Sequence, residues 1–239
     1  MSSLRITVFA REQIILKRNY NNLLHGLLYS CFKERNPKLH DEGFRDGPMA
    51  YRLFVFGPLI GKVSKVDRRR CCYEGPITFE FRSPVTSNVK ILASELQNRG
   101  TVSIGRYNLP LINLERVDRL VYPYRVARAR TIQPIYVESN QRGLSPRDPS
   151  WLEHIQSNAA SKARAWGGLD STVSTDLQVK PLSDGVFQTV QIYKEELSCW
   201  TGEFSIACDQ QLMGFLYDCG LGAKNSVGFG MFELDDTPL

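Results

Sequence analysis

The chain has 239 residues, of which 42% are hydrophobic and 23% charged, and 30 Lys and Arg against 25 Asp and Glu give a net charge of +5. This composition is typical of a globular protein and excludes a disordered chain, which has fewer apolar residues and more uncompensated charge. No apolar run approaches the roughly 20 residues of a membrane-spanning helix. Residues 1–13 contain no apolar core of signal-peptide length, so we expect a cytoplasmic protein.

The cysteine pattern indicates reduced, mostly buried thiols. There is no CxxC motif, and the adjacent Cys71 and Cys72 cannot easily bridge each other. The three histidines form no cluster with metal-ligand spacing, so we expect no metal and no other cofactor. The six cysteines are Cys31, Cys71, Cys72, Cys199, Cys208 and Cys219.

The first half of the chain predicts the element order βαββαβ. Alternating β-branched residues indicate strands, and a leucine stripe at helical spacing indicates a helix that Pro37 ends. The expected elements are a strand at 4–9, a helix at 19–33, extended segments at 51–60 and 75–82, a helix at 84–98 and strand residues from 101 to 114. That order is a split βαβ unit.

The second half predicts the same order without obvious residue identity to the first. We expect a strand at 127–138, a helix at 150–166, strands at 176–181 and 186–193 paired across the turn at 183–185, a strand at 200–208, a helix at 209–217 and a last strand at 229–234. The fold class is therefore α+β: two tandem ferredoxin-like (βαββαβ, RRM-like) domains, 1–120 and 121–239, with the boundary near 119–124.

A glycine-rich segment lies between the last helix and the last strand. Glycines at this density let backbone N–H groups approach a ligand, and Lys224 adds a cation, so an anion is the expected guest. The phosphate loop of NTPases is excluded because Lys224 leads into a strand, and the dinucleotide fingerprint fails at Asn225. On glycine count alone, a plain β-turn explains the segment equally well. The four glycines are Gly220, Gly222, Gly228 and Gly230.

Residues 220–233, GLGAKNSVGFGMFE, resemble the C-terminal glycine-rich signature of the CRISPR-associated endoribonucleases that cut precursor crRNA within its repeats, the Cas-six family. The resemblance extends to segments 27–30, 36–42 and 52–56, where that family has a helix tyrosine, a histidine after leucine and a basic residue before a strand. It covers nearly the whole chain and implies two ferredoxin-like domains, in agreement with the element order.

The resemblance also implies a chemistry. In that family the 2′-OH of the RNA attacks the adjacent phosphate without a metal, a general base takes the hydroxyl proton, and a general acid protonates the departing 5′ oxygen. The products are a 2′,3′-cyclic phosphate and a 5′-OH. DNA lacks the nucleophile and cannot be cut in this way. Histidine suits the two proton transfers because its pKa lies near the operating pH.

Carried over by position, His40 is the expected general acid/base, Tyr29 orients the 2′-OH or shares in its deprotonation, and Arg52 holds the scissile phosphate. Arg52 departs from the lysine that the family often has there; it keeps the charge but cannot act as a base. His25 is the rival catalytic histidine, since it lies four residues before Tyr29 on the same predicted helix face.

The expected RNA contacts combine the glycine-rich segment with a strand of the second half. Arg128 and Arg130 alternate on one strand face, whereas Lys162 and Arg164 are expected on a solvated helix face. No RNP aromatic motif is present, so recognition is expected to use backbone and shape. The predicted RNA-binding residues are Gly220, Gly222, Lys224, Asn225, Ser226, Gly228, Gly230, Arg128 and Arg130.

Two alternatives to this endoribonuclease remain open. One is a non-catalytic subunit that binds repeat RNA in a CRISPR ribonucleoprotein, and the other is an unrelated enzyme that uses the glycine-rich segment for a small anion. The presence of His40, Tyr29 and Arg52 favours the enzyme over the binding subunit. The expected partners are precursor crRNA and other subunits of a CRISPR effector complex, with no membrane, and the chain is expected to be a monomer or a homodimer.

Overall fold

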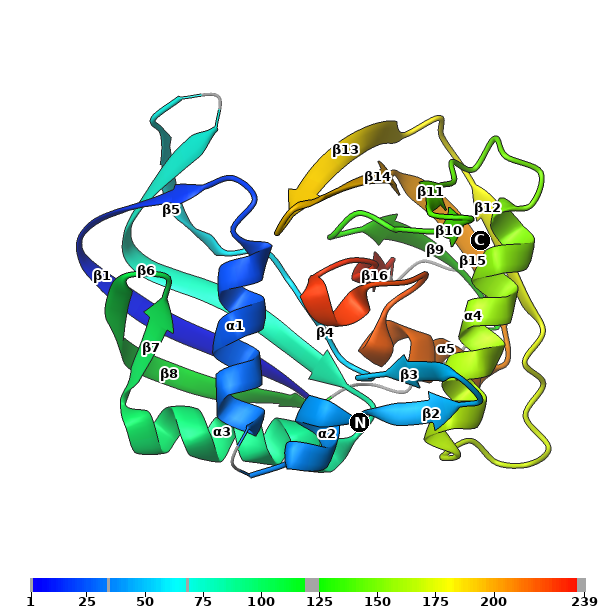
Figure 1. Cartoon of the computed structure of the whole chain (residues 1–239), viewed down its shortest axis with the longest axis horizontal. Helices are drawn as coiled ribbons and strands as arrows, with labels where there is room; N and C mark the ends of the chain where they lie inside the picture. The colour runs from blue at the N-terminus through cyan, green and yellow to red at the C-terminus, as the bar shows by residue number, and fades with distance from the viewer. Residues whose placement is uncertain (1, 34, 68, 119–124, 236–239) are drawn as a thin grey trace.

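The computed structural model describes residues 2–33, 35–67, 69–118 and 125–235, without the side chains of Ser2, Lys38, His40, Lys65 and Asp118. The chain forms two sheets side by side, one from each half of the sequence, and each sheet carries helices (Figure 1). This is the tandem ferredoxin-like arrangement that the element order predicted. The predicted boundary at 119–124 lies outside the described residues.

The first sheet is built around three long strands, β1 (Ser2–Lys17), β6 (Arg70–Ser83) and β8 (Tyr107–Asp118). Its strand order is β4-β6-β1-β8-β7, and β5 also pairs with β6. The remaining elements are α1 (Asn21–Phe32), α2 (Pro37–Asp41), β2 (Phe44–Asp46), β3 (Met49–Tyr51), β4 (Val55–Phe56), β5 (Ile60–Lys65), α3 (Thr86–Arg99) and β7 (Thr101–Ile104).

Two hydrophobic periodicities build this half. Along β1, Ile6 and Val8 are buried while Arg5 between Leu4 and Ile6 is exposed, as alternation along a strand requires. On α1, Leu24 and Leu28 recur at helical spacing and are fully buried against the sheet. The polar face of α1 is therefore turned away from the first core.

The second sheet has the order β12-β15-β9-β16, formed by β12 (Leu177–Pro181), β15 (Glu203–Cys208), β9 (Val126–Thr131) and β16 (Phe232–Leu234). The helices α4 (Trp151–Trp166) and α5 (Gln210–Cys219) pack on it and bury a second core. Two small additions are the pair β10 (Glu138–Ser139) and β11 (Arg142–Gly143) and the hairpin of β13 (Val186–Ile192) and β14 (Glu195–Thr201). A short 3-10 helix, η1 (Asn225–Val227), lies in the glycine-rich segment.

The predicted strand pairing in this half is wrong at one place. The segments 176–181 and 186–193 do not pair with each other: β12 pairs with β15 in the main sheet, and β13 pairs with β14 in a separate hairpin. Correspondingly, the single strand expected at 200–208 is divided at Gly202 between β14 and β15. The turn at 183–185 thus connects two different sheets rather than two paired strands.

Other differences concern where elements begin and end. Pro37, expected only to stop a helix, opens α2, because its fixed φ suits the first position of a helix. The segment expected at 51–60 is broken into short strands, and the last strand is shorter than expected. All six cysteines are free and buried, as predicted.

A buried arginine joins the two halves. Arg82, on β6, is 1% exposed at its side chain and donates 2.8 Å bonds to the carboxylate of Glu80 and to the carbonyl oxygen of Phe232 on β16. It also pairs with Glu233, and its guanidinium lies 4.0 Å from the ring centre of Tyr217 on α5. The edge of the second sheet is thereby fixed to the first sheet.

Candidate active site and glycine-rich loop

Helix α1 presents His25 and Tyr29 on one face, one turn apart. Their ring centres are 4.1 Å apart with the planes tilted by 53°, and the Tyr29 ring also meets Phe54, with centres 6.2 Å apart. Both side chains are half-buried, unlike the leucines of the opposite stripe. The prediction that His25 lies on the same helix face as Tyr29 is confirmed.

A third aromatic residue reaches this pair from the second half of the chain. Tyr193 lies at the tip of the β13–β14 hairpin, which slants toward α1 (Figure 1), and its hydroxyl is 2.5 Å from Nδ1 of His25. Although the side chain is 57% exposed, desolvation of its phenol raises the pKa of Tyr193, and Tyr29 adds to the rise. Sequence reasoning missed Tyr193, because nothing local to a strand end indicates a partner 168 residues away.

The hairpin that carries Tyr193 rests on the glycine-rich loop, residues 219–231. Ile192 and Leu197 of the hairpin share a small buried cluster with Phe229 of the loop. Two residues after Tyr193, Glu195 forms a 2.8 Å ion pair with Lys224 of the loop. The hairpin therefore contacts α1 at its tip and the loop along its side.

His40 belongs to the short helix α2, and its side chain is outside the described part of the structure. Arg52 acts on the segment that follows His40: its two terminal nitrogens each donate a 3.1 Å hydrogen bond, one to the carbonyl of Asp41 and one to that of Glu42. The guanidinium predicted to hold phosphate thus binds the backbone at the end of α2.

The four glycines of the loop are buried and have positive φ, between +68° and +88°. A Cβ on Gly230 would lie 1.9 Å from the carbonyl oxygen of Leu221, and one on Gly222 would lie 2.4 Å from that of Tyr136. The glycines therefore permit close backbone packing within the protein. Their predicted contact with RNA stays a prediction.

Two polar side chains hold the loop from inside. The amide nitrogen of Asn225 donates 3.0 Å bonds to the carbonyls of Leu221 and Phe229. Lys162 of α4 donates to the carbonyls of Gly220 and Gly222 at 2.6 and 3.2 Å and to the side-chain oxygen of Asn225 at 3.1 Å. The expectation that Lys162 lies on a solvated helix face is wrong: it is 2% exposed, and burial lowers its pKa.

Two exposed cations of the predicted RNA site, Lys224 and Arg128, already have acidic partners. Lys224 is exposed beside Glu195, and Ser226 next to it in the loop is half-buried. On β9, Arg128 and Arg130 are exposed on one face while Ala127 and Ala129, which alternate with them, are buried, as the alternation predicted. Arg128 pairs with Glu203 and lies 3.6 Å from Asp235. Arg164 is exposed, as expected, and pairs with Asp46.

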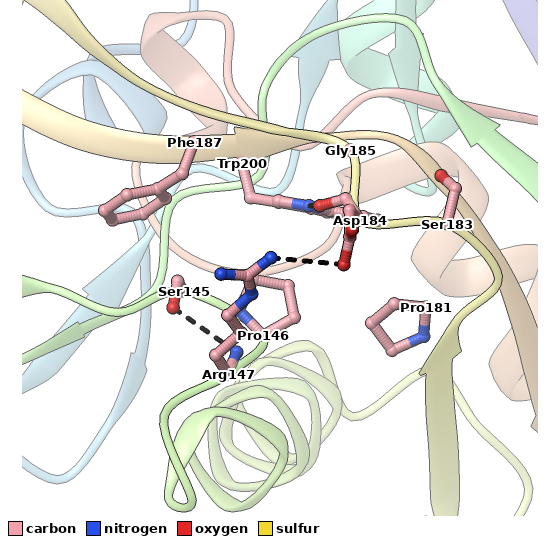
Figure 2. A pocket seen from close by; sticks show the side chains of 9 residues that line it. All are labelled: Ser145, Pro146, Arg147, Pro181, Ser183, Asp184, Gly185, Phe187 and Trp200. Carbon is pink, nitrogen blue, oxygen red and sulfur yellow. Dashed lines mark hydrogen bonds and ion pairs between the residues drawn. The ribbon is translucent and has the colours of Figure 1, made fainter.

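A cavity of about 410 Å³ lies at the other end of the β13–β14 hairpin (Figure 2). Among its lining residues, Arg147 pairs with Asp184 at 3.2 Å, and Phe187 and Trp200 contribute aromatic rings. None of the residues predicted to bind RNA lines it.

Within the described ranges, no three His, Cys, Asp or Glu side chains are grouped so that they could hold a metal ion. Among the helices in the described residues, none is long and apolar enough to cross a membrane.

Known proteins match this chain in sequence. Residues 122–234 match the family described as CRISPR associated protein Cas6, C-terminal. The chain is 22% identical over 233 residues to the CRISPR-associated endoribonuclease Cas6 1 of Methanocaldococcus jannaschii, covering 91% of this chain and 86% of that protein.

Solved structures show the same fold over the full length. A Cas6-related protein from Pyrococcus furiosus has a TM-score of 0.80 at 16% identity, covering 98% of both chains. A RAMP protein described as binding different RNA substrates also has a TM-score of 0.80 at 16% identity, covering 99% of this chain and 100% of that one. Residues 122–234 therefore match the Cas6 C-terminal family, and the whole chain has the fold of the solved Cas6-related structures.

Proposed function

We propose that this protein is a metal-independent endoribonuclease that binds CRISPR repeat RNA and cleaves precursor crRNA once in each repeat. The observation that carries the proposal is the cluster of His25, Tyr29 and Tyr193, which one hairpin joins to the cation of the glycine-rich loop. Such a cluster offers groups for proton transfer beside a site for phosphate. The match of residues 122–234 to the Cas6 C-terminal family supports RNA processing, and the Methanocaldococcus relative is named an endoribonuclease.

In the proposed reaction the 2′-OH of one nucleotide attacks the neighbouring phosphorus. A base takes the hydroxyl proton, the P–O5′ bond breaks, and an acid returns a proton to the 5′ oxygen, which leaves a 2′,3′-cyclic phosphate and a 5′-OH. We assign the orientation of the attacking hydroxyl to Tyr29, which lies in contact with His25. Histidine is the suited acid/base because its pKa lies close to neutral pH.

Two histidines compete for this role. His40 is proposed from the family resemblance, and Arg52 supports it by fixing the backbone that follows it. His25 is supported by its contacts with both tyrosines. In either case we assign Arg52 to positioning α2 through its bonds to the backbone there, and we assign the phosphate contact to Lys224, which must exchange Glu195 for RNA when it binds.

The test is cleavage of repeat RNA in the presence of EDTA by the wild type and by His40→Ala, His25→Ala and Tyr29→Phe. His154→Ala is the matched control, since His154 is the third histidine and lies on α4. We expect EDTA-resistant cleavage, loss of about 10²–10⁴-fold in rate for the catalytic histidine, and no effect of His154→Ala. A substrate with a 2′-deoxyribose at the cut site should bind and stay intact.

Three results would contradict the proposal. Cleavage that requires a divalent metal excludes the metal-independent mechanism. Cleavage of the deoxy substrate excludes the 2′-OH as the nucleophile. Tight binding of repeat RNA with no cleavage by the wild type indicates the non-catalytic binding subunit instead. A further result decides only between the two histidines: if His40→Ala keeps the full rate and His25→Ala is inactive, the acid/base is His25 on α1.

A further inference from the structure

We propose that Tyr193 is a positioning residue for His25, so that the active face of α1 is completed by the second half of the chain. The inference rests on the proposed function, since it assigns a task to the rival histidine of that reaction. It begins from one contact, the 2.5 Å hydrogen bond between the Tyr193 hydroxyl and Nδ1 of His25. This contact joins a helix of the first half to a hairpin of the second.

The two tyrosines contact the imidazole in different ways. Tyr29 lies against the ring with centres 4.1 Å apart, and the Tyr193 ring meets it edge-on with centres 6.0 Å apart and planes at 78°. A side chain on a helix surface otherwise samples several rotamers. Contact with Tyr29 on its own helix and a hydrogen bond from another element select one of them.

The backbone of Tyr193 provides a second, independent observation. Its φ is +53°, in the left-handed region that a bulky residue rarely adopts and that glycine or asparagine occupies more easily. Strain of this kind persists where the surroundings over-determine it, often at functional sites. A turn that only had to reverse the chain would not need tyrosine here.

The hairpin is firmly placed, so its tip can serve as a reference point. Leu197 and Ile192, beside the tip, are buried with Phe229 of the glycine-rich loop. The element that positions His25 is therefore the element that packs on the proposed RNA-binding loop.

The hydroxyl of Tyr193 suits a histidine that changes protonation state. A phenol O–H donates to a bare Nδ1, and its oxygen accepts from Nδ1–H when the ring carries that proton. The contact is kept in both states, and proton exchange with RNA falls to Nε2. Phenylalanine at this position preserves the ring and loses the hydrogen bond in both states.

The test compares Tyr193→Phe with Tyr107→Phe, which also removes a hydrogen-bonded phenol hydroxyl but lies on β8. Single-turnover cleavage, RNA affinity and the ¹⁵N signals of the His25 ring are measured for each. We expect Tyr193→Phe to lower the cleavage rate roughly tenfold at unchanged affinity, a loss of orientation, and to shift the His25 signals. Tyr107→Phe changes neither.

Further variants separate positioning from folding. Tyr193→Gly removes the backbone strain together with the contact, so we expect slower cleavage without a lower melting temperature. If Tyr193 acts through His25, adding Tyr193→Phe to His25→Ala causes no further loss, because coupled residues are not additive.

The outcomes distinguish this inference from the proposed function. If the wild type cleaves and Tyr193→Phe has wild-type rate and wild-type His25 signals, the inference is wrong and the function stands. Full activity of His25→Ala also overturns it. If the wild type cleaves no RNA, the proposed function fails, and the ring signals in Tyr193→Phe still decide whether Tyr193 orients His25.

Discussion

Lys162 shows how a single buried charge can organise a loop. It is buried on α4 and donates to three oxygens of the glycine-rich loop. We expect Lys162→Met to keep the volume of the side chain and leave these oxygens without their donor, at a cost of about 1–3 kcal/mol in unfolding free energy. RNA affinity should fall with it. Denaturant melts and RNA titrations measure both, with Lys90→Met on the exposed face of α3 as control.

The same residue gives a pH dependence with a defined sign. Because burial lowers the pKa of Lys162 in the folded state, the unfolded chain binds this proton more tightly than the folded one. The free energy of unfolding therefore rises with pH, from the lowered pKa up to the ordinary lysine value of about 10.4. The wild type should gain stability relative to Lys162→Met over that window. A difference that stays flat, or that shrinks as pH rises, contradicts the assignment.

The spacing of the buried residues on α4 already indicated that position 162 faces the core. Ile155 and Ala159 are buried, and Lys162 continues their stripe at helical spacing, but its residue type favoured a solvated position. Its acceptors follow about 60 residues later in the chain, so no local pattern could reveal them. His25 and Tyr29 were predicted together because their relation is local, and Tyr193 was not, because its relation to them is long-range.

At the scale of elements, the glycine-rich loop depends on glycines, whose lack of a side chain allows its close packing. Gly230→Ala places a Cβ 1.9 Å from the carbonyl oxygen of Leu221 in a residue with φ +75°. We expect this variant to lose more unfolding free energy than the roughly 1–2 kcal/mol that the left-handed conformation alone costs a residue with a Cβ. We also expect it to bind RNA more weakly. Gly100→Ala is the matched control, since Gly100 has φ +64° and open space around its Cβ position.

Melting temperatures and RNA titrations of the two variants separate conformation from packing. If Gly230→Ala and Gly100→Ala lose equal stability, close packing does not determine the loop. If only stability changes and RNA affinity does not, the loop is a structural turn, which was the alternative explanation of its glycines.

The element order was predictable from alternation and helical spacing, and the pairing of the strands was not. Strand-like residues at 176–181 and 186–193 were recognised, with a turn between them. Their partners are decided by burial far along the chain: Leu177 and Val179 join the second core, whereas Ile192 packs on Phe229 of the loop. The sequence of a turn does not determine which of the two cores the following strand packs against.

At the scale of the whole molecule, the position of one half on the other determines the candidate site, because His25 and Tyr193 come from different halves. The side chain of Arg82, which reaches from β6 to Phe232 and Glu233 of β16, fixes part of this contact. Nothing in the local sequence of β6 distinguished Arg82 from a surface arginine. Its acceptor on β16 is 150 residues away.

Arg82→Ala tests this contact. The change leaves the carboxylates of Glu80 and Glu233 and the carbonyl of Phe232 without their cation, and removing one partner from a buried charged pair costs about 3–5 kcal/mol. Arg5→Ala is the control: Arg5 lies on the same sheet, but its pair with Glu115 is about half exposed and contributes about 0–1 kcal/mol. If urea unfolding shows that Arg82→Ala and Arg5→Ala lose equal unfolding free energy, the buried arginine does not hold the halves together. If Arg82→Ala instead unfolds in two steps, with slowed cleavage at the first, the docking of the halves completes the site.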